Sequence, residues 1–263
     1  MARTERLIVT RVGRDGERRR PDDLIVEEPM SIQLDGTMVS TTMRTPGHDY
    51  ELAAGFCFTE GLLDGLPVTG VRYCATGPAI DTEFNVVTVE TGGRAPTPTP
   101  RLGTTSSSCG WCGSDQLDEM TARLSPLADS EPIPIHVLIK VPALVRDTQT
   151  LFESTGSVHA AAVFDRAGTV LTTREDVGRH NAVDKVIGAR VLAGDGPAGG
   201  LGLFVSGRAS IEMVQKAWAG GFTTLLAVSA PTALAVRAAR RANMMLAGFV
   251  RGDALNIYSG DRA

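Results

Sequence analysis

The sequence predicts an α/β protein with a β-rich N-terminal part. From residue 133 onward, strand-like apolar runs alternate with helix-like segments, which indicates a largely parallel sheet with helices on its faces. Before residue 104, short strand patterns and turn residues predominate. The chain has 263 residues, of which 43% are hydrophobic, so it can bury a substantial core as one large domain or two small ones.

The first 25 residues are expected to form a basic arm. The run ERRR at residues 17–20 stands among interspersed acids, which is typical of a solvated, partly disordered segment. No apolar run in the chain reaches the length of a signal peptide or a transmembrane helix, so we expect a cytoplasmic protein with no membrane partner. The net charge of −4 argues against nucleic acid as a partner, because phosphate binding needs a basic surface.

Residues 26–103 are expected to form a β-rich part that ends in a Pro/Thr loop. Residues 30–43 predict two strands joined at Asp35-Gly36, a pair that tolerates the positive φ of a tight turn. Residues 48–61 predict a helix that ends at Gly61, and residues 84–90 a further strand. Proline then alternates with threonine over residues 96–100, which excludes helix and ladder and predicts an extended loop.

Residues 104–132 are expected to hold a CxxC loop and a helix. The Pro/Thr loop leads into Cys109 and Cys112, either as a linker or as a mobile loop that carries them to more than one place. At the start of a helix, the dipole lowers a thiol pKa and supplies a thiolate, as a dithiol oxidoreductase or a sulfur carrier requires. Cys57 and Cys74 stand in apolar settings and are expected to be buried.

We expect no metal. A structural zinc site needs four ligands, but no second CxxC is present and the four histidines are scattered singly. The HxE and PCxxC signatures of zinc deaminases are absent as well.

Residues 133–263 are expected to form the α/β part. The pattern begins with a strand at 133–140, a helical segment at 143–154 and a hairpin across 159–173. Strands and helices then alternate to the end of this part, at residues 181–194, 202–206, 211–220, 223–229, 232–242 and 245–251.

Three strand-to-helix junctions share small and polar residues. In open α/β sheets the carboxyl ends of strands face the ligand, and helix N-termini there favour phosphate. Gly207 and Ser229 would let a phosphate approach the backbone, and Arg179 and Arg208 would add charge. The junctions lie at residues 175–185, 205–212 and 228–236.

An ordinary explanation of each junction also exists. Taken singly, Asn181, Ser210, and Thr232 or Ser229 are as well explained as helix N-caps. Three such junctions together favour an anionic ligand. The sequence contains no standard phosphate-binding motif of a nucleotide-binding protein in a fitting context. Its GxGxxG match, at residues 194–199, precedes a strand and contains proline.

Several stretches of the chain, in order, resemble the formate dehydrogenase accessory sulfurtransferase family of the FdhD type. They are EEPMSIQLDG, MRTPGHDYELAAGFCFTEG, SSSCGWCG, HAAAVFD, EDVGRHNAVDKVIG, VSGRAS, SAPTALAV and GFVRGDALNIY.

This resemblance implies an α/β/α sandwich related to the cytidine deaminase fold without its zinc chemistry, and a cytoplasmic homodimer. The expected activity is to take sulfur from a cysteine desulfurase and deliver it to the molybdenum bis(molybdopterin guanine dinucleotide) cofactor of formate dehydrogenase. Cys109 would be the persulfide carrier, and Cys112 matches the second family cysteine. The residues expected at the cofactor are Phe249, Val250, Arg251, Gly252, Asp253, Ala254, Arg179, His180, Gly207, Arg208 and Ser229.

Three hypotheses therefore stand: a sulfurtransferase, a dithiol oxidoreductase and a noncatalytic chaperone of the cofactor. A chaperone would need the site at the strand ends but not Cys109. An oxidoreductase would need both cysteines of the CxxC but no guanine nucleotide.

Overall fold

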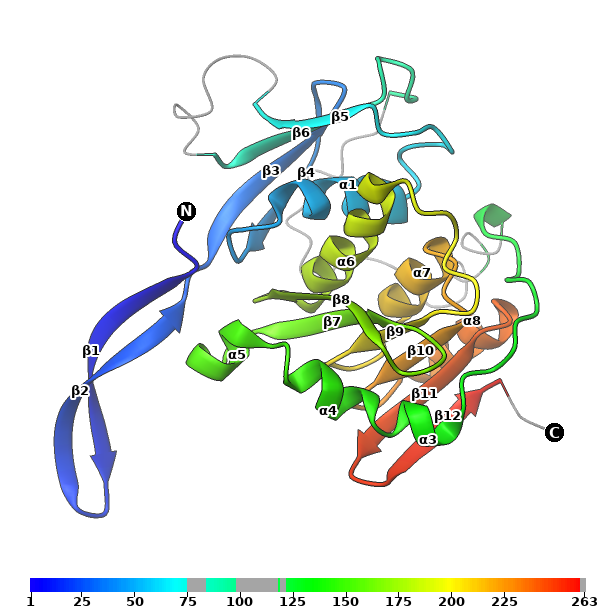
Figure 1. Ribbon diagram of the computed structural model, residues 1–263. Coiled ribbons are helices and arrows are strands. Elements are labelled where there is room, and N and C mark those ends of the chain that lie inside the picture. Colours follow the sequence, from blue (N-terminus) through cyan, green and yellow to red (C-terminus); the bar gives the residue numbers. More distant parts are fainter. Residues whose placement is uncertain (75–83, 98–117, 119–121, 261–263) are drawn as a thin grey trace.

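The computed structural model describes residues 1–74, 84–97, 118 and 122–260. Within these ranges the strands form three sheets (Figure 1). One has two strands, one has four in the order β4-β3-β6-β5, and one has six in the order β12-β11-β10-β9-β7-β8. The CxxC and the end of the Pro/Thr loop lie outside the described residues. The domain boundaries expected from the sequence stay predictions.

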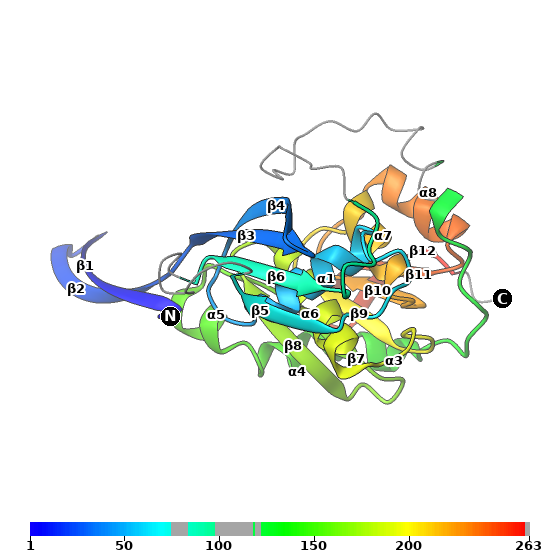
Figure 2. The same ribbon diagram turned by 90° about the horizontal axis from the view of Figure 1, so that it is seen from above.

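The N-terminal arm is a regular hairpin. β1 (Thr4–Gly13) pairs with β2 (Gly16–Ile25) along its whole length, and the hairpin projects from the body in both views (Figures 1 and 2). The prediction of a partly disordered arm was therefore wrong. Opposite charges pair across the two strands, since Arg6 donates to both carboxylate oxygens of Asp23 at 2.7 and 2.9 Å. The β-branched residues in β1 also favour the strand conformation.

The four-stranded sheet confirms the elements expected around Asp35-Gly36. β3 (Glu28–Leu34) and β4 (Thr37–Arg44) form the hairpin, with positive φ at both turn residues. Helix α1 (Asp49–Thr59) ends just before Gly61, whose φ of 71° closes it as predicted. β6 (Val86–Glu90) is the expected strand and pairs with β5 (Gly70–Tyr73), which was not predicted.

The six-stranded sheet is parallel in its middle. β9 (Gly202–Val205), β10 (Thr224–Ala227) and β11 (Met245–Arg251) run in parallel, as expected. β7 (His159–Phe164) and β8 (Val170–Asp176) form the predicted hairpin, with β7 antiparallel to β9. β12 (Ala254–Ser259) adds an antiparallel edge strand that was not predicted.

Helices cover both faces of this sheet, which confirms the layered α/β/α sandwich (Figure 1). Alternate strand residues point to opposite faces, so Val163 and Val205 join one core, and Ala162 and Phe204 join the other. The first core lies under α6 (Arg179–Ala193), α7 (Ile211–Ala219) and α8 (Ala233–Arg241). The second lies under α3 (Ile135–Leu138) and α4 (Val141–Arg146), which α5 (Thr150–Thr155) follows.

The strand expected at residues 133–140 was wrong, because this segment contains α3. Pro134 is the N-cap of α3, and Pro142 stands in the first turn of α4, positions where a missing N–H costs nothing. A short buried apolar run fits either element by periodicity alone. Among the described residues, no helix is both long and apolar enough to cross a bilayer.

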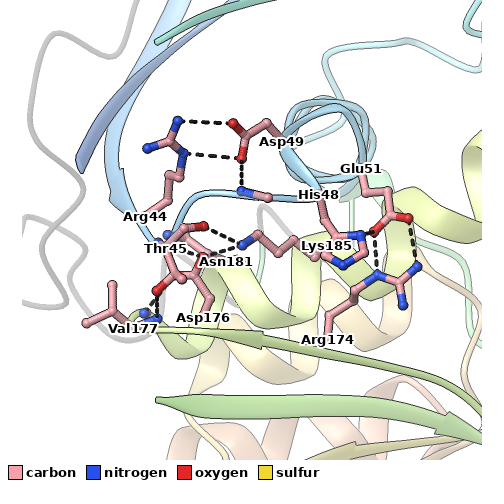
Figure 3. A network of polar contacts seen from close by, with 12 residues as sticks. Arg44, Thr45, His48, Asp49, Glu51, Arg174, Asp176, Val177, Asn181 and Lys185 are labelled. Carbon is pink, nitrogen blue, oxygen red and sulfur yellow. Dashed lines mark hydrogen bonds and ion pairs between the residues drawn. The ribbon is translucent and has the colours of Figure 1, made fainter. Parts of the chain in front are cut away.

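The N-terminal part is joined to the main sheet by a close crossing of α1 and α6. A Cβ atom on Gly55 of α1 would overlap the carbonyl oxygen of Asp184 on α6. A Cβ on Gly188 of α6 would likewise overlap the carbonyl oxygen of Glu51 on α1. The two glycines let the helix backbones touch, which brings the loop between β4 and α1 close to the start of α6 (Figure 3).

Candidate functional site

The three predicted junctions meet at one edge of the six-stranded sheet. β8 and β9 are each antiparallel to β7, and β10 and β11 are parallel to β9, so all four strands end at this edge. Backbone hydrogen bonds join the segments that follow them. The amide of Ser229 donates to the carbonyl of Gly207, and the amide of Phe249 donates to the carbonyl of Ser229, both at 3.3 Å.

Arg179 lies next to these hydrogen-bonded segments, beside Gly207. A Cβ atom on Gly207 would lie 3.5 Å from Cδ of Arg179 and 3.6 Å from Cε1 of His159. Four predicted site residues, Arg179, Gly207, Ser229 and Phe249, are therefore neighbours. We call the strand-end edge formed by residues 176–181, 206–210, 229–232 and 249, together with His159, the carboxyl edge.

The remaining predicted residues of the last segment divide into two groups. Val250 is buried in the core beneath α3 and α4, so its side chain does not face the carboxyl edge. Phe249 is 41% exposed and has a φ of 53°, which is costly for an aromatic residue and typical of functional sites. Arg251, Gly252, Asp253 and Ala254 follow it in the exposed β11–β12 turn.

His159 and Ser206 belong to the carboxyl edge although the sequence did not single them out. The Ser206 hydroxyl accepts from the amide of Ala160 at 2.9 Å and lies 3.3 Å from Nδ1 of His159. Burial, followed by the charges of Arg179 and His180, lowers the pKa of His159, which favours the neutral form of this ring. The one feature of the sequence that could have identified these two residues is their position at the ends of strands that meet at this edge.

The side chain of His180 contacts Glu212, a further residue that the sequence did not single out. Its Nε2 lies 2.7 Å from a carboxylate oxygen of Glu212, which also accepts from the Ser210 hydroxyl at 3.3 Å. The hydrogen bond from His180 lowers the pKa of Glu212 and outweighs the opposing effect of burial. This contact ties the start of α6 to the first turn of α7.

Two of the three helix starts lack a side-chain cap. α6 begins after Gly178, and Ser210 before α7 makes no capping hydrogen bond. Asn181 lies inside α6, so its role as an N-cap is excluded. Only Thr232 caps its helix in the ordinary way, by accepting from the amide of Ala235. The first amides of α6 and α7 are free of side-chain caps, as a phosphate site requires.

The carboxyl edge holds two arginine side chains, Arg179 and Arg208. Within the described ranges, neither Arg179 nor the exposed Arg208 forms an ion pair, and the buried Nε of Arg179 has no hydrogen-bond acceptor. A buried donor without an acceptor is costly. An anionic ligand would satisfy both arginines, so the arrangement suits a phosphorylated molecule.

The cysteines divide into two pairs. Cys109 and Cys112 lie outside the described residues. Cys57 and Cys74 are buried, as predicted. Burial, with the nearby carboxylates of Asp184, Asp35 and Glu60, raises the pKa of Cys57 to about 12. Among the described residues, no three His, Cys, Asp or Glu side chains gather as a metal site.

Comparison with known proteins gives concordant results. The model of the FdhD/NarQ family matches residues 25–263. The sulfur carrier protein FdhD of Streptomyces coelicolor is 45% identical, with 98% of this chain and 94% of that protein covered. The protein of the same name from Nocardia farcinica is 44% identical, with 98% and 93% covered.

A solved structure shares the fold. It is described as a formate dehydrogenase accessory protein from Desulfotalea psychrophila, and it matches with a TM-score of 0.76 at 21% identity, covering 98% of each chain. Because the family model spans nearly all of the sequence and relatives above 40% identity cover it almost end to end, the chain belongs to the FdhD/NarQ family.

Proposed function

We propose that this protein is a cytoplasmic sulfurtransferase that carries sulfur from a cysteine desulfurase to the molybdenum bis(molybdopterin guanine dinucleotide) cofactor of formate dehydrogenase. The names of its curated relatives support the sulfur-carrying role. A homodimer is part of the proposal because the family resemblance implies one.

Cys109 is the proposed carrier. Its thiolate attacks the terminal sulfur of the donor persulfide, the donor cysteine leaves as a thiolate, and Cys109 holds the new persulfide. When the outer sulfur passes to the cofactor, the S–S bond breaks and its electron pair stays on Cys109 as the thiolate, while the cofactor, as substrate, supplies the pair for the new bond to sulfur. Cys112 lies three positions later in the sequence and matches the second family cysteine. Cys57 does not compete, because it is buried and its pKa is raised to about 12.

The observation that carries the proposal is the convergence of the predicted ligand residues on the carboxyl edge. Gly207, Ser229 and Phe249 are linked by backbone hydrogen bonds, and Arg179 lies against Gly207. The uncapped starts of α6 and α7 supply amides for a diphosphate, and Arg208 supplies charge. The exposed ring of Phe249 offers an apolar surface for a base. The guanine nucleotide ends of the cofactor combine these two chemistries.

The decisive experiment compares Cys109→Ala with Cys112→Ala. Cells that contain only the Cys109→Ala protein should have no formate dehydrogenase activity, although the variant should fold normally. Cys112→Ala should cause an equal or smaller loss. After exposure to a cysteine desulfurase and cysteine, mass spectrometry of the wild type should find one extra sulfur on the peptide that contains Cys109.

The same experiment separates the other hypotheses. Full formate dehydrogenase activity with Cys109→Ala would contradict sulfur transfer and favour a chaperone of the cofactor. A disulfide between Cys109 and Cys112 during turnover, with no persulfide and no binding of guanine nucleotide, would favour a dithiol oxidoreductase.

A further inference from the structure

We propose that Thr45 and Asp176 are positioning residues for the ligand site at the carboxyl edge. They anchor the turn at residues 176–178, from which Arg179 and His180 begin, to the loop between β4 and α1 of the N-terminal part. Affinity for a guanine nucleotide should therefore depend on Thr45, more than a hundred residues earlier in the chain. This inference rests on the proposed function, because it concerns the same site.

Asp176 is fully buried and uses both of its carboxylate oxygens (Figure 3). One oxygen accepts from the amide of Gly178 at 2.8 Å and from Nδ2 of Asn181 at 3.0 Å. The other accepts from the amide of Thr45 at 3.1 Å and pairs with Nζ of Lys185 at 2.7 Å. The first oxygen thus shapes the turn, and the second joins it to the N-terminal part.

Thr45 uses all three of its polar groups here, two on the turn and one on Lys185 of α6 (Figure 3). Its amide donates to Asp176, its carbonyl accepts from Lys185 at 2.8 Å, and its hydroxyl oxygen accepts from the amide of Val177 at 3.0 Å. The side chain is fully buried, so no water is available to replace the hydroxyl. Loss of that oxygen leaves the amide of Val177 without an acceptor, and the turn must shift to find one.

A shift of this turn would move the ligand groups. Val177 and Gly178 immediately precede Arg179, and Gly178 provides no capping side chain of its own. The direction of the first turn of α6, and the path of the Arg179 side chain past Gly207, are therefore set by the Thr45–Asp176 contact. Asn181 provides a second contact between this turn and the N-terminal part, because its Nδ2 also donates to the carbonyl of Met43 at 2.8 Å.

The chain contains a matched control for this network. Thr59 on α1 is also buried, and its hydroxyl donates to Asp184 on α6 at 2.8 Å and accepts from Lys216 at 2.9 Å. It therefore serves a second buried aspartate–lysine pair, in which Asp184 lies on α6 and Lys216 on α7. Asp184 lies five residues beyond Arg179 along α6, and its side-chain partners are not at the carboxyl edge.

The test compares Thr45→Val, Thr45→Ser and Thr59→Val, with GDP as the probe in calorimetry. Thr45→Val should weaken GDP binding by about three- to tenfold, as expected for one lost hydrogen bond. Thr45→Ser restores the oxygen and should bind like the wild type. Thr59→Val should lower the thermal unfolding temperature without changing GDP affinity. Hydrogen exchange at residues 177 and 178 should accelerate in Thr45→Val alone.

Each outcome of this test either supports or contradicts the positioning role of Thr45 and Asp176. Unchanged GDP affinity in Thr45→Val, or equal weakening in Thr59→Val, would overturn the positioning role while leaving the site intact. If the wild type does not bind GDP even at millimolar concentration, the proposed ligand site itself is wrong and this inference falls with it. Should Thr45→Val fail to fold, Asn181→Ala removes the second contact between the turn and the N-terminal part and should weaken GDP binding in the same way.

Discussion

Cys57 lacks both properties that make a thiol reactive. Its side chain is 0% exposed, and burial with nearby carboxylates raises its pKa to about 12. A reactive cysteine is accessible and has a lowered pKa. A persulfide formed on the folded protein is therefore expected elsewhere in the chain.

Alkylation tests this expectation directly. In the folded protein at pH 8, iodoacetamide should leave Cys57 unmodified, and after denaturation it should modify Cys57 fully. Peptide mass spectrometry gives the occupancy of each cysteine in the two conditions. Rapid labelling of Cys57 in the native protein would show that the α1 region opens, and would remove the argument against Cys57 as a sulfur carrier.

Arg208 offers a test of the carboxyl edge at the same scale. It is exposed and, in the described part of the chain, pairs with no acid, so it contributes little to folding. Arg208→Ala should weaken GDP binding about ten- to hundredfold, equivalent to roughly 1.5–3 kcal/mol for one charge-assisted contact. Calorimetry gives the affinity, and thermal unfolding of the free protein should not change.

Arg166→Ala is the matched control for this prediction. Arg166 is also exposed, but it lies in the β7–β8 turn at the opposite edge of the sheet, beside Glu131. Its loss should leave GDP affinity unchanged. Equal effects of the two substitutions would mean that GDP responds to net charge rather than to the carboxyl edge.

At the scale of elements, the crossing of α1 and α6 reverses the usual effect of a glycine in a helix. Alanine normally stabilises a helix interior by about 1 kcal/mol relative to glycine. At Gly55 and Gly188, however, a Cβ would overlap the backbone of the facing helix, so the two helices would have to separate. Overpacking of this kind costs several kcal/mol.

We therefore expect Gly55→Ala and Gly188→Ala each to lower the free energy of unfolding by about 3 kcal/mol or more. Urea unfolding measures the change. Gly196→Ala serves as the control, because a Cβ there would meet nothing within 4 Å, and it should be neutral. A neutral result at Gly55 would show that the helices cross at a greater distance.

At the scale of the whole molecule, Glu51 and Arg174 form an ion pair between the N-terminal part and the main sheet. Nη2 of Arg174 on β8 donates to Glu51 on α1 at 2.7 Å, and His48 adds a further contact at 3.2 Å (Figure 3). Burial raises the pKa of Glu51, but the hydrogen bonds from Arg174 and His48 outweigh it and bring the pKa to about 2.

The sign of the pH dependence follows from this lowered pKa. An unfolded glutamate titrates near pH ~4.3, so the stabilisation from Glu51 is complete above that pH and is lost as the pH falls toward 2. Glu51→Gln should lower the free energy of unfolding by on the order of 2 kcal/mol at pH 7. The difference from the wild type should shrink steadily below pH ~4.3.

Urea unfolding at pH 7, 4 and 3 would check this prediction. Glu153→Gln is the control, since Glu153 is exposed on α5, and it should behave like the wild type at each pH. A difference for Glu51→Gln that stays constant with pH would mean that packing, rather than charge, accounts for the effect.

Much of the fold was predictable because it depends on local chemistry. The turn at Asp35-Gly36 and the helix end at Gly61 follow from residues that tolerate positive φ. The alternation after residue 159 indicated the parallel strands β9 to β11. Local patterns failed at α3, where a short apolar run between prolines fits two elements, and in the arm, where pairing between strands overrides the charge of β2.

The sequence by itself determined the strand-to-helix junctions, the buried state of Cys57 and the family, because each depends on residue types in a short window or on the order of motifs. Only the tertiary structure decided that His159 and Ser206 lie at the carboxyl edge, that Glu212 contacts His180 there, and that Thr45 contacts the turn before α6. These residues meet because β7 runs antiparallel to its neighbours and because Gly55 and Gly188 let α1 touch α6. Contacts between residues far apart in the chain depend on how layers pack, and no local pattern encodes that packing.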